Sequence, residues 1–311
     1  MARPLTSSAA YQLPFFPEHE NDLGRVVNVA QVAQLSPFRY PGGKTWLVPR
    51  VIRWLLSFPR RPATFIEPFA GGGIVSLTAA NMNLADHVTM VELDPDVAAV
   101  WQTMLSDHAE WLASEIVTFD LTPKNAEARL KSCARTLREN AFQTLLKNRV
   151  YHGGILAPGA GVLKYGENGR GIKSRWYPET LQKRILKVAT FRDRITFING
   201  DGIQVMKDNA HRKDAAFFID PPYTAAGKKA GSRLYTHFDL DHEELFRVTA
   251  TLAGDFLMTY DDAKGVRDLA RKHDFKMRTI AMKNTHHAEM KELLIGRNLD
   301  WVGTQASKVI E

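Results

Sequence analysis

Short apolar runs separated by turn residues recur along much of the chain and predict an α/β protein. Residues 64–66 and 88–91 are apolar enough to form buried strands, and residues 74–82 between them have helical periodicity. A strand, a helix and a second strand in this order predict a βαβ unit. Later apolar runs predict further strands at residues 195–198, 215–219, 256–259, 275–281 and 293–295.

The middle of the chain interrupts this alternation. Residues 97–111 and 125–146 have helical periodicity, and another helix is expected from Pro178 to about Val188. Residues 150–177 contain seven glycines interleaved with basic and aromatic residues, which predicts a hairpin or a long loop. We therefore expect an N-terminal arm at residues 1–35, an α/β domain made of residues 36–104 and 195–311, and an inserted lobe at residues 105–194.

Positive charge is concentrated in the same central region. The net charge of the chain is +7. Residues 124–194 hold 16 Lys plus Arg against 5 Asp plus Glu, so this segment carries +11 and the rest of the chain carries −4. A charge run is often only a solvated helical face. Because this one interrupts an otherwise slightly acidic chain, we expect it to contact nucleic acid.

The cysteine content and the hydropathy pattern point to a cytoplasmic protein. The single cysteine, Cys133, can form neither an internal disulfide nor a cysteine zinc site. No apolar stretch approaches ~18 residues, and residues 1–14 lack the apolar core of a signal peptide. The pair His286-His287 suggests no third metal ligand nearby, so no metal is expected.

A glycine-rich turn follows the first predicted strand. The run Glu67-Pro68-Phe69-Ala70 leads into Gly71-Gly72-Gly73, which opens the predicted helix. Glycines there let a ligand approach the backbone, and the helix N-terminus supplies free N–H donors. The dinucleotide fingerprint is incomplete because Ser76 occupies the position of its third glycine. A purely structural strand-to-helix turn therefore remains an alternative.

Acidic residues follow two further strands. Glu92 lies about 20 residues past the glycines, where a carboxylate usually accepts hydrogen bonds from ribose hydroxyls. Asp201-Gly202 follows the strand at residues 195–198, where the carboxylate can accept from an exocyclic amine such as that of adenine. Upstream, Tyr40-Pro41-Gly42-Gly43-Lys44 is not a phosphate loop, because Phe38 stands where that loop needs its first glycine. This turn suits an adenosyl ligand that carries a carboxylate, or is simply a surface turn.

Asp220-Pro221-Pro222-Tyr223 directly follows the apolar run at residues 215–219. The prolines end the strand, so a carboxylate and an aromatic ring are held at its carboxyl end, where ligands bind in open α/β sheets. The exocyclic amine of adenine or cytosine is a poor nucleophile because its lone pair is delocalised into the ring. A carboxylate and a rigid backbone carbonyl that accept its hydrogens favour a pyramidal, reactive nitrogen. Tyr223 can stack on the base.

The ordered set of motifs, from about Phe38 to Arg297, resembles Dam-type S-adenosylmethionine-dependent adenine methyltransferases of DNA. That resemblance implies a Rossmann-like α/β sheet with helices on both faces and a target-recognition insertion. It also implies that Asp220, Pro221, Pro222 and Tyr223 hold the flipped base, with Glu92 on the cofactor ribose and Asp201 on its adenine. The implied cofactor residues are Tyr40, Gly43, Lys44, Glu67, Pro68, Phe69, Gly71, Gly73, Glu92, Asp201, Gly202 and Asp220.

Residues 148–154 resemble the segment that begins the DNA-reading hairpin in this family. The similarity ends at Ile155, so the resemblance does not indicate which DNA sequence this protein would recognise. The residues expected to contact DNA are Arg149, Tyr151, His152, Lys164, Arg170, Lys173 and Arg175.

The expected reaction is methylation of adenine N6 in double-stranded DNA, after the base has left the stack. Cys133 lies away from the candidate pocket, so no covalent cysteine intermediate is expected. Methylation of cytosine N4, methylation of adenine N6 in RNA, and a catalytically silent nucleic-acid-binding regulator remain alternatives. The biological setting, whether restriction, phage or genome maintenance, and the oligomeric state, a monomer included, stay open.

Overall fold

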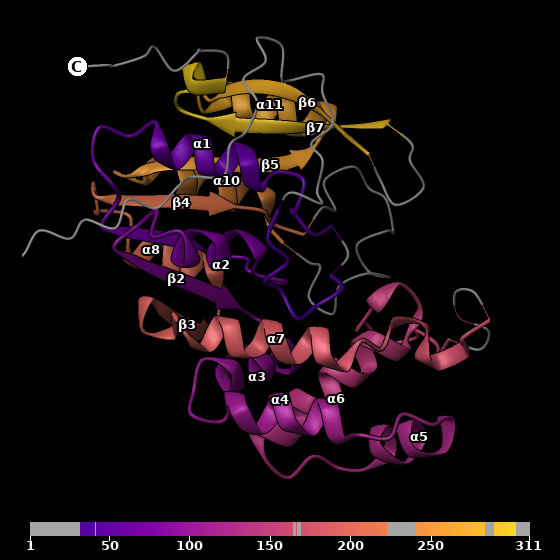
Figure 1. Cartoon of the computed structure of the whole chain (residues 1–311). Helices are drawn as coiled ribbons and strands as arrows, with labels where there is room; N and C mark the ends of the chain where they lie inside the picture. Colours follow the sequence, from indigo (N-terminus) through magenta and orange to yellow (C-terminus); the bar gives the residue numbers. More distant parts are fainter. Residues whose placement is uncertain are drawn as a thin grey trace, which may run out of the picture.

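A seven-stranded sheet forms the centre of the protein (Figure 1). The computed structural model describes residues 32–40, 42–163, 166, 169–222, 240–283 and 289–302. The strand order is β3-β2-β1-β4-β5-β7-β6, and all pairings are parallel except those of β7 with β5 and β6. The strands are β1 Thr64–Glu67, β2 His87–Glu92, β3 Ile195–Asn199, β4 Ala215–Ile219, β5 Asp255–Asp261, β6 Lys276–Lys283 and β7 Glu289–Gly296.

The first five strands have the order of a doubly wound α/β sheet. Strand β1 is flanked by β2 on one side and by β4 on the other, so the chain reverses its direction of growth between β1 and β4. Ligands bind in the crevice outside the carboxyl ends of the strands at such a switch point. The predicted strands and the predicted α/β fold are confirmed.

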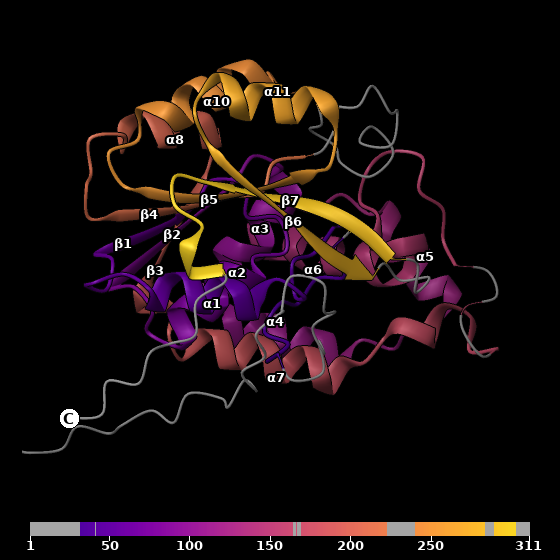
Figure 2. The same cartoon turned by 90° about the horizontal axis from the view of Figure 1, so that it is seen from above.

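Helices cover both faces of the sheet (Figure 2). One face carries α1 Val48–Leu56, α2 Ile74–Asn81 and α3 Pro95–Met104, and the other carries α8 Gly202–Asp208, α10 His242–Thr251 and α11 Lys264–Lys272. Strand β4 supplies both hydrophobic cores, because Ala216 and Phe218 face the first and Phe217 and Ile219 face the second. A strand buried on both faces is a continuous apolar run, which is why β4 is so clear in the sequence.

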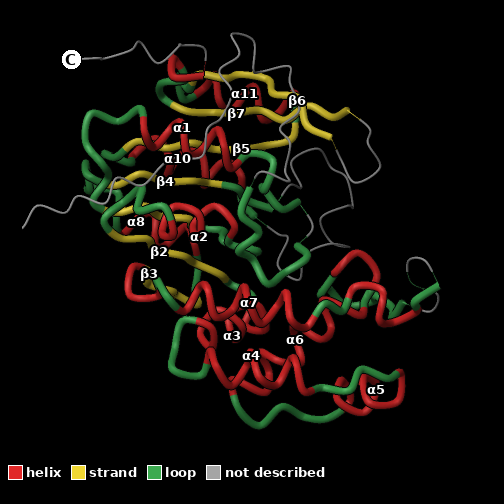
Figure 3. Tube along the Cα trace, viewed as in Figure 1, coloured by secondary structure: helices red, strands yellow, loops and turns green. Residues whose placement is uncertain are grey.

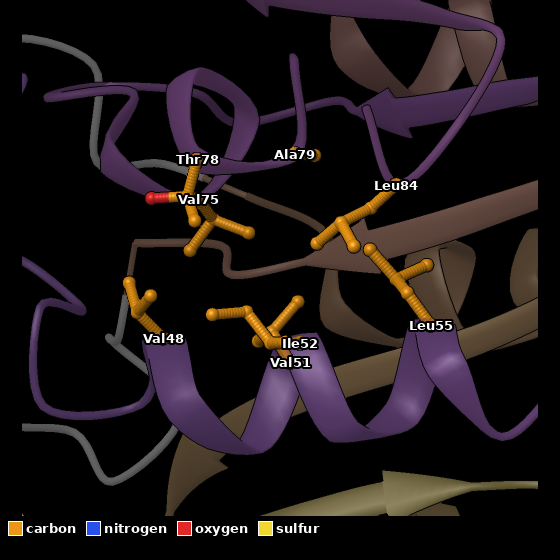
Figure 4. A pocket seen from close by; sticks show the side chains of 8 residues that line it. All are labelled: Val48, Val51, Ile52, Leu55, Val75, Thr78, Ala79 and Leu84. Carbon is orange, nitrogen blue, oxygen red and sulfur yellow. The ribbon is translucent and has the colours of Figure 1, made fainter. Parts of the chain in front are cut away.

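Helix α1, which the apolar runs did not indicate, packs tightly on α2 (Figure 4). The space between their facing side chains is too small for a water molecule, so this contact is packed core. It anchors α1, which begins at Val48, shortly after the Gly42-Gly43-Lys44 turn. The lining side chains are Val48, Val51, Ile52, Leu55, Val75, Thr78, Ala79 and Leu84.

The segment between α3 and β3 is built of helices and loops (Figure 3). Its long helices are α4 Ala109–Thr118, α5 Pro123–Lys131, α6 Leu137–Val150 and α7 Pro178–Ala189. The helical prediction is confirmed, but two of the predicted helices are each divided in two. The helix expected at residues 97–111 is α3 and α4, and the helix expected at residues 125–146 is α5 and α6. Thr136 starts α6 because its side chain and that of Glu139 each accept the other's backbone N–H, in a capping box.

The insertion packs against the α1–α3 face of the sheet. Trp101 of α3, Leu112 of α4, Phe142 of α6 and Ile185 of α7 belong to one hydrophobic core. Beyond α6, Tyr151 and Val162 form an antiparallel bridge, in agreement with a hairpin. The expected arm at residues 1–35 lies outside the described residues, except for its last four. Within the described ranges, none of the helices has the length and apolar character needed to cross a membrane.

Candidate functional site

Acidic residues collect at the carboxyl edge of the sheet. Glu67 ends β1, Glu92 ends β2, Asp220 follows β4 and Asp261 ends β5. Since these strands are parallel, their carboxyl ends lie at one edge. Three of the four acids were singled out from the sequence, and the structure brings them to the switch point between β1 and β4.

Asp220 forms a cluster with Lys44 and Thr259. Lys44 Nζ lies 3.1 Å from Asp220 Oδ1, and Thr259 Oγ1 donates a 2.7 Å hydrogen bond to the same oxygen. Lys44 Nζ also lies 3.6 Å from Glu292 Oε1. The Lys44 side chain is only 4% exposed. Burial lowers the pKa of Lys44, but the Asp220 and Glu292 carboxylates outweigh burial and raise this pKa overall.

Sequence reasoning missed Thr259 and Glu292 as members of this cluster. Thr259 lies in the strand predicted at residues 256–259, but its hydroxyl was not assigned a partner. In the sequence, the sign that Glu292 is unusual is its position directly before the apolar run at residues 293–295, where an acid is expected to be buried with the predicted strand. Its role depends on the antiparallel register that sets Glu292 opposite Asp261.

Glu92 is held at the end of β2 by two backbone donors. Its Oε2 accepts the N–H of Gly71 and its Oε1 accepts the N–H of Asp94, both at 2.9 Å. Burial raises the pKa of Glu92 to about 7, although both hydrogen bonds act against that rise. Each carboxylate oxygen has a second lone pair, so this oriented side chain can still accept from ligand hydroxyls.

The glycine turn lies directly under Tyr40. Gly71 has a φ of +47°, and a Cβ there would lie 2.6 Å from the Tyr40 ring. The Trp101 indole N–H donates to the Gly71 carbonyl at 3.0 Å. Gly73 adopts a left-handed conformation and begins α2 without a side-chain cap. The turn therefore needs glycine for both its conformation and its close packing.

Glu67, at the end of β1, is bound by the backbone at Ser76, which occupies the third glycine position of the dinucleotide fingerprint. The Ser76 N–H donates to Glu67 Oε2 at 2.9 Å. Burial raises the pKa of Glu67 to about 8, although the hydrogen bond from Ser76 lowers it.

The remaining expected cofactor residues surround these groups. Asp201 caps α8 by accepting the Ile203 N–H at 2.8 Å and is exposed. A Cβ on Gly202 would lie 2.1 Å from the Pro68 carbonyl oxygen, so the start of α8 touches the turn after β1. Phe69 and Pro222 are half-buried and Pro221 is buried, while the Gly43 N–H donates to the Tyr40 carbonyl at 3.1 Å. Tyr223 lies outside the described residues.

The residues expected to contact DNA fall into two groups. His152, Arg170 and Lys173 are exposed, while Tyr151 and Arg175 are half-buried. Lys147 places its ammonium 5.7 Å from the centre of the Tyr151 ring. Lys164 and the pair His286-His287 lie outside the described residues.

Arg149 lies in the interior, where it does not suit the expected phosphate contact. Its guanidinium donates to the Pro37 carbonyl, and burial, with Arg184 and Arg39 nearby, lowers the pKa of Arg149 to about 9. The adjacent Asn148 accepts the Arg39 N–H at 2.9 Å and donates to the Arg39 carbonyl at 3.0 Å. Together these side chains fasten residues 37–39, which lead to Tyr40, onto the insertion.

The buried acids predict that the folded protein loses stability as pH rises. The pKa values of Glu67, Glu92 and Glu292 lie at about 8, about 7 and about 7, above the ordinary 4.5. Between pH 4.5 and 8 the folded state therefore binds more protons than the unfolded chain, so stability is present at the low end and is lost as pH rises through these values. His242, whose pKa burial lowers, acts in the opposite direction below pH 6.5.

Urea unfolding is expected to give a free energy of unfolding on the order of 2 kcal/mol higher at pH 5.5 than at pH 8. The Glu67→Gln variant should lose part of this dependence, and Asp214→Asn, a change at an exposed acid, should keep it. Equal stability of the wild-type protein at the two pH values would contradict the assignment.

Comparison with known proteins supports a methyltransferase. Residues 40–129 match the family model described as D12 class N6 adenine-specific DNA methyltransferase, and S-adenosylmethionine is the methyl donor that this match implies. No curated protein sequence matches the chain.

Solved structures similar to the chain include several methyltransferases. A putative RNA methyltransferase from Pyrococcus horikoshii has 10% identity and a TM-score of 0.42, with 86% of this chain and 94% of that chain covered. The rRNA methyltransferase aviRa from Streptomyces viridochromogenes has 13% identity and a TM-score of 0.37, with 83% and 86% covered. A precorrin-6y C5,15-methyltransferase from Geobacter metallireducens has 10% identity and a TM-score of 0.34, with 81% and 86% covered.

The site residues fit S-adenosylmethionine. The Tyr40 ring packs directly on the glycine turn at Gly71, so an aromatic ring is held at this edge of the sheet, where it can contact an adenosyl group. Glu92 offers oriented acceptors for ribose hydroxyls. Asp201 is exposed at the same edge of the sheet, where it can accept from an adenine amine.

Proposed function

We propose that this protein transfers a methyl group from S-adenosylmethionine to N6 of adenine in double-stranded DNA. The observation that carries the proposal is the contact of the half-buried Asp220 with the buried Lys44 and Thr259 at the sheet switch point. It places a carboxylate with a fixed orientation at the edge where Glu92 and the glycine turn can hold the methyl donor. The D12 match over residues 40–129 supports adenine and DNA.

Asp220 would act on the target amine. Lys44 and Thr259 both contact Asp220 Oδ1, which fixes the plane of the carboxylate before the base arrives. A carboxylate accepting from the amine, together with the backbone at Pro221, favours a nitrogen whose lone pair points at the methyl group. S-adenosylmethionine supplies that methyl group on a positively charged sulfur. The N–C bond would form as the C–S bond breaks, which leaves S-adenosylhomocysteine, and the methylated nitrogen would then release one proton to the solvent.

Cofactor contacts would come from the residues around the switch point. Glu92 would accept from the ribose hydroxyls and Asp201 from the adenine amine, while Tyr40 and the backbone at Gly71 would lie against the adenosyl group. Glu67 lies between these sites, because it ends β1, which is flanked by β2 with Glu92 and by β4, which Asp220 follows. A cationic sulfur would be favoured among these acids.

The insertion at residues 105–194 would bind the DNA. Its described residues 151–163 and 169–177 extend on the side toward which β2 and β4 point (Figure 1). Base pairs in a duplex are shielded, so the target adenine must leave the stack to reach Asp220. The exposed His152, Arg170 and Lys173 are suited to phosphate contacts that would hold the duplex during this step.

The proposed reaction can be tested by nucleoside analysis. The full chain would be incubated with radiolabelled S-adenosylmethionine and either duplex DNA or RNA of mixed sequence, and the digested nucleosides separated. We expect labelled N6-methyladenine from DNA. Labelled N4-methylcytosine, or label in RNA alone, would assign the site to another amine or polymer. Cofactor binding without label in any nucleic acid would favour a regulator.

The double variant Arg170→Gln/Lys173→Gln is expected to weaken DNA binding most at low salt. Each phosphate contact that is lost should reduce the slope of log K against log salt by about 1, so the slope should fall by up to about 2. Fluorescence anisotropy at several salt concentrations measures it. The matched control is Arg271→Gln/Lys272→Gln on α11, and a slope that is the same in all three proteins would exclude the two insertion residues from the interface.

A further inference from the structure

Glu292 is a buried acid that the proposed reaction does not yet use. It lies on β7, is 5% exposed, and sits opposite Asp261 of β5 and Ile280 of β6. Its Oε1 lies 3.6 Å from Lys44 Nζ. Its Oε2 is buried and has no hydrogen-bond partner within the described structure. A buried carboxylate oxygen without a partner is costly, so its presence at this position needs a reason.

Charge balance does not supply that reason. Lys44 already pairs with Asp220 at 3.1 Å, and one ammonium neutralises one carboxylate. Glu292 adds a second carboxylate that competes for the same ammonium. Its neighbours on β7, Leu293, Leu294 and Ile295, are apolar and fully buried, so an apolar residue would suit the local packing. Glu292 instead changes the strength of the ion pair between Lys44 and Asp220.

We propose that Glu292 is a positioning residue for methyl transfer, which shares the Lys44 ammonium with Asp220 and thereby keeps the Asp220 carboxylate a strong acceptor for the target amine. This inference rests on the proposed function. When Glu292 is ionised, Lys44 is held between two carboxylates, and Asp220 keeps more of its negative charge for the substrate. When Glu292 is protonated, it no longer competes with Asp220 for the Lys44 ammonium, and the stronger Lys44–Asp220 pair weakens Asp220 as an acceptor.

The charged groups around Glu292 determine the pH at which its carboxyl group loses its proton. Lys44 faces it from the segment before α1, Asp220 from the end of β4 and Asp261 from β5. Burial is the largest influence, and together with Asp220 and Asp261 it raises the pKa of Glu292 to about 7, while Lys44 lowers it. The methyl-transfer rate should therefore rise as pH increases through about 7.

Single-turnover methylation at saturating cofactor and DNA tests the inference between about pH 6 and 8.5. The wild-type rate should rise with pH. The Glu292→Gln variant should be about tenfold slower at the upper end and should no longer respond to pH around 7. Its KM for S-adenosylmethionine should stay close to that of the wild type. The matched control Glu243→Gln, at an exposed acid on α10, should keep the wild-type rate and pH profile.

Two further measurements keep the test decisive. Glu292→Asp retains the charge and should restore the pH response, which a purely packing role would not predict. Infrared titration of the full chain follows the carboxyl groups without turnover. Because Glu67 and Glu92 also titrate near this pH, the readout is the difference between the wild-type and Glu292→Gln spectra, which should contain a protonated-acid band that titrates near pH 7. A Glu292→Gln rate and profile equal to wild type, or no such band, would overturn the inference. Failure of the wild type to methylate nucleic acid would instead reject the proposed function, and the infrared titration would still decide whether Glu292 titrates.

Discussion

Replacing Asp220 by alanine is expected to abolish methyl transfer, with a fall in rate of at least about 10³-fold. Asp220 is the carboxylate that Lys44 and Thr259 orient at the switch point. Without it, only the backbone at Pro221 would remain of the two proposed acceptors for the target amine, and the lone pair of the nitrogen would stay largely delocalised in the ring. Cofactor binding should change little, because the expected ribose acceptor, Glu92, is held separately by Gly71 and Asp94.

Radiolabel transfer to DNA and calorimetric titration with S-adenosylmethionine measure the two effects independently. Asp220→Asn is the informative companion, because it keeps the size of the side chain and can still accept from Thr259 but lacks the charge. We expect it to be nearly as inactive as Asp220→Ala. Asp214→Asn, at an exposed acid beside the amino end of β4, should retain activity. Substantial turnover by Asp220→Ala would reject the role assigned to this carboxylate.

The variant Lys44→Met is expected to destabilise the protein by roughly 3–5 kcal/mol at pH 8, where the neighbouring acids are ionised. Methionine fills a similar volume but leaves Asp220 and Glu292 without the ammonium that now contacts both. The loss should be smaller near pH 5.5. Lys44 lowers the pKa of Glu292, so in the variant that pKa rises further and the side chain becomes neutral at low pH.

Urea unfolding at the two pH values measures this effect, and Lys272→Met on the exposed face of α11 is the control. The variant should also lose methyl-transfer activity at a pH and temperature where it remains folded, as judged by circular dichroism. A loss of stability no larger than that of Lys272→Met would mean that Lys44 does not hold the two carboxylates in the folded protein.

Much of the sheet could be predicted because the responsible patterns are local. Residues 215–219 form an uninterrupted apolar run ended by two prolines, so both the strand and its end are fixed by neighbouring residues. The helices of the insertion were harder to delimit. The break before α6 depends on a capping box between Thr136 and Glu139, which can start a new helix inside a stretch that keeps helical periodicity.

The sequence predicted which residues belong to the candidate site better than it predicted the contacts among them. Glu67, Glu92 and Asp220 were expected at strand ends, and parallel strands bring such ends to one edge. Arg149 shows the limit, since a basic residue in a positive segment resembles a phosphate ligand. Only packing showed that its guanidinium is buried against the Pro37 carbonyl.

The sequence by itself determined which residues form the strands, which acids and glycines follow them, and where positive charge is concentrated, because apolar periodicity and turn chemistry act over a few residues. The tertiary structure alone decided that Lys44 lies between Asp220 and Glu292. These three residues come from segments far apart in the chain, and their distances depend on the antiparallel register of β7 and on how residues 36–44 cross the edge of the sheet. Electrostatic pairing falls off with distance, so the properties of the site follow from that geometry.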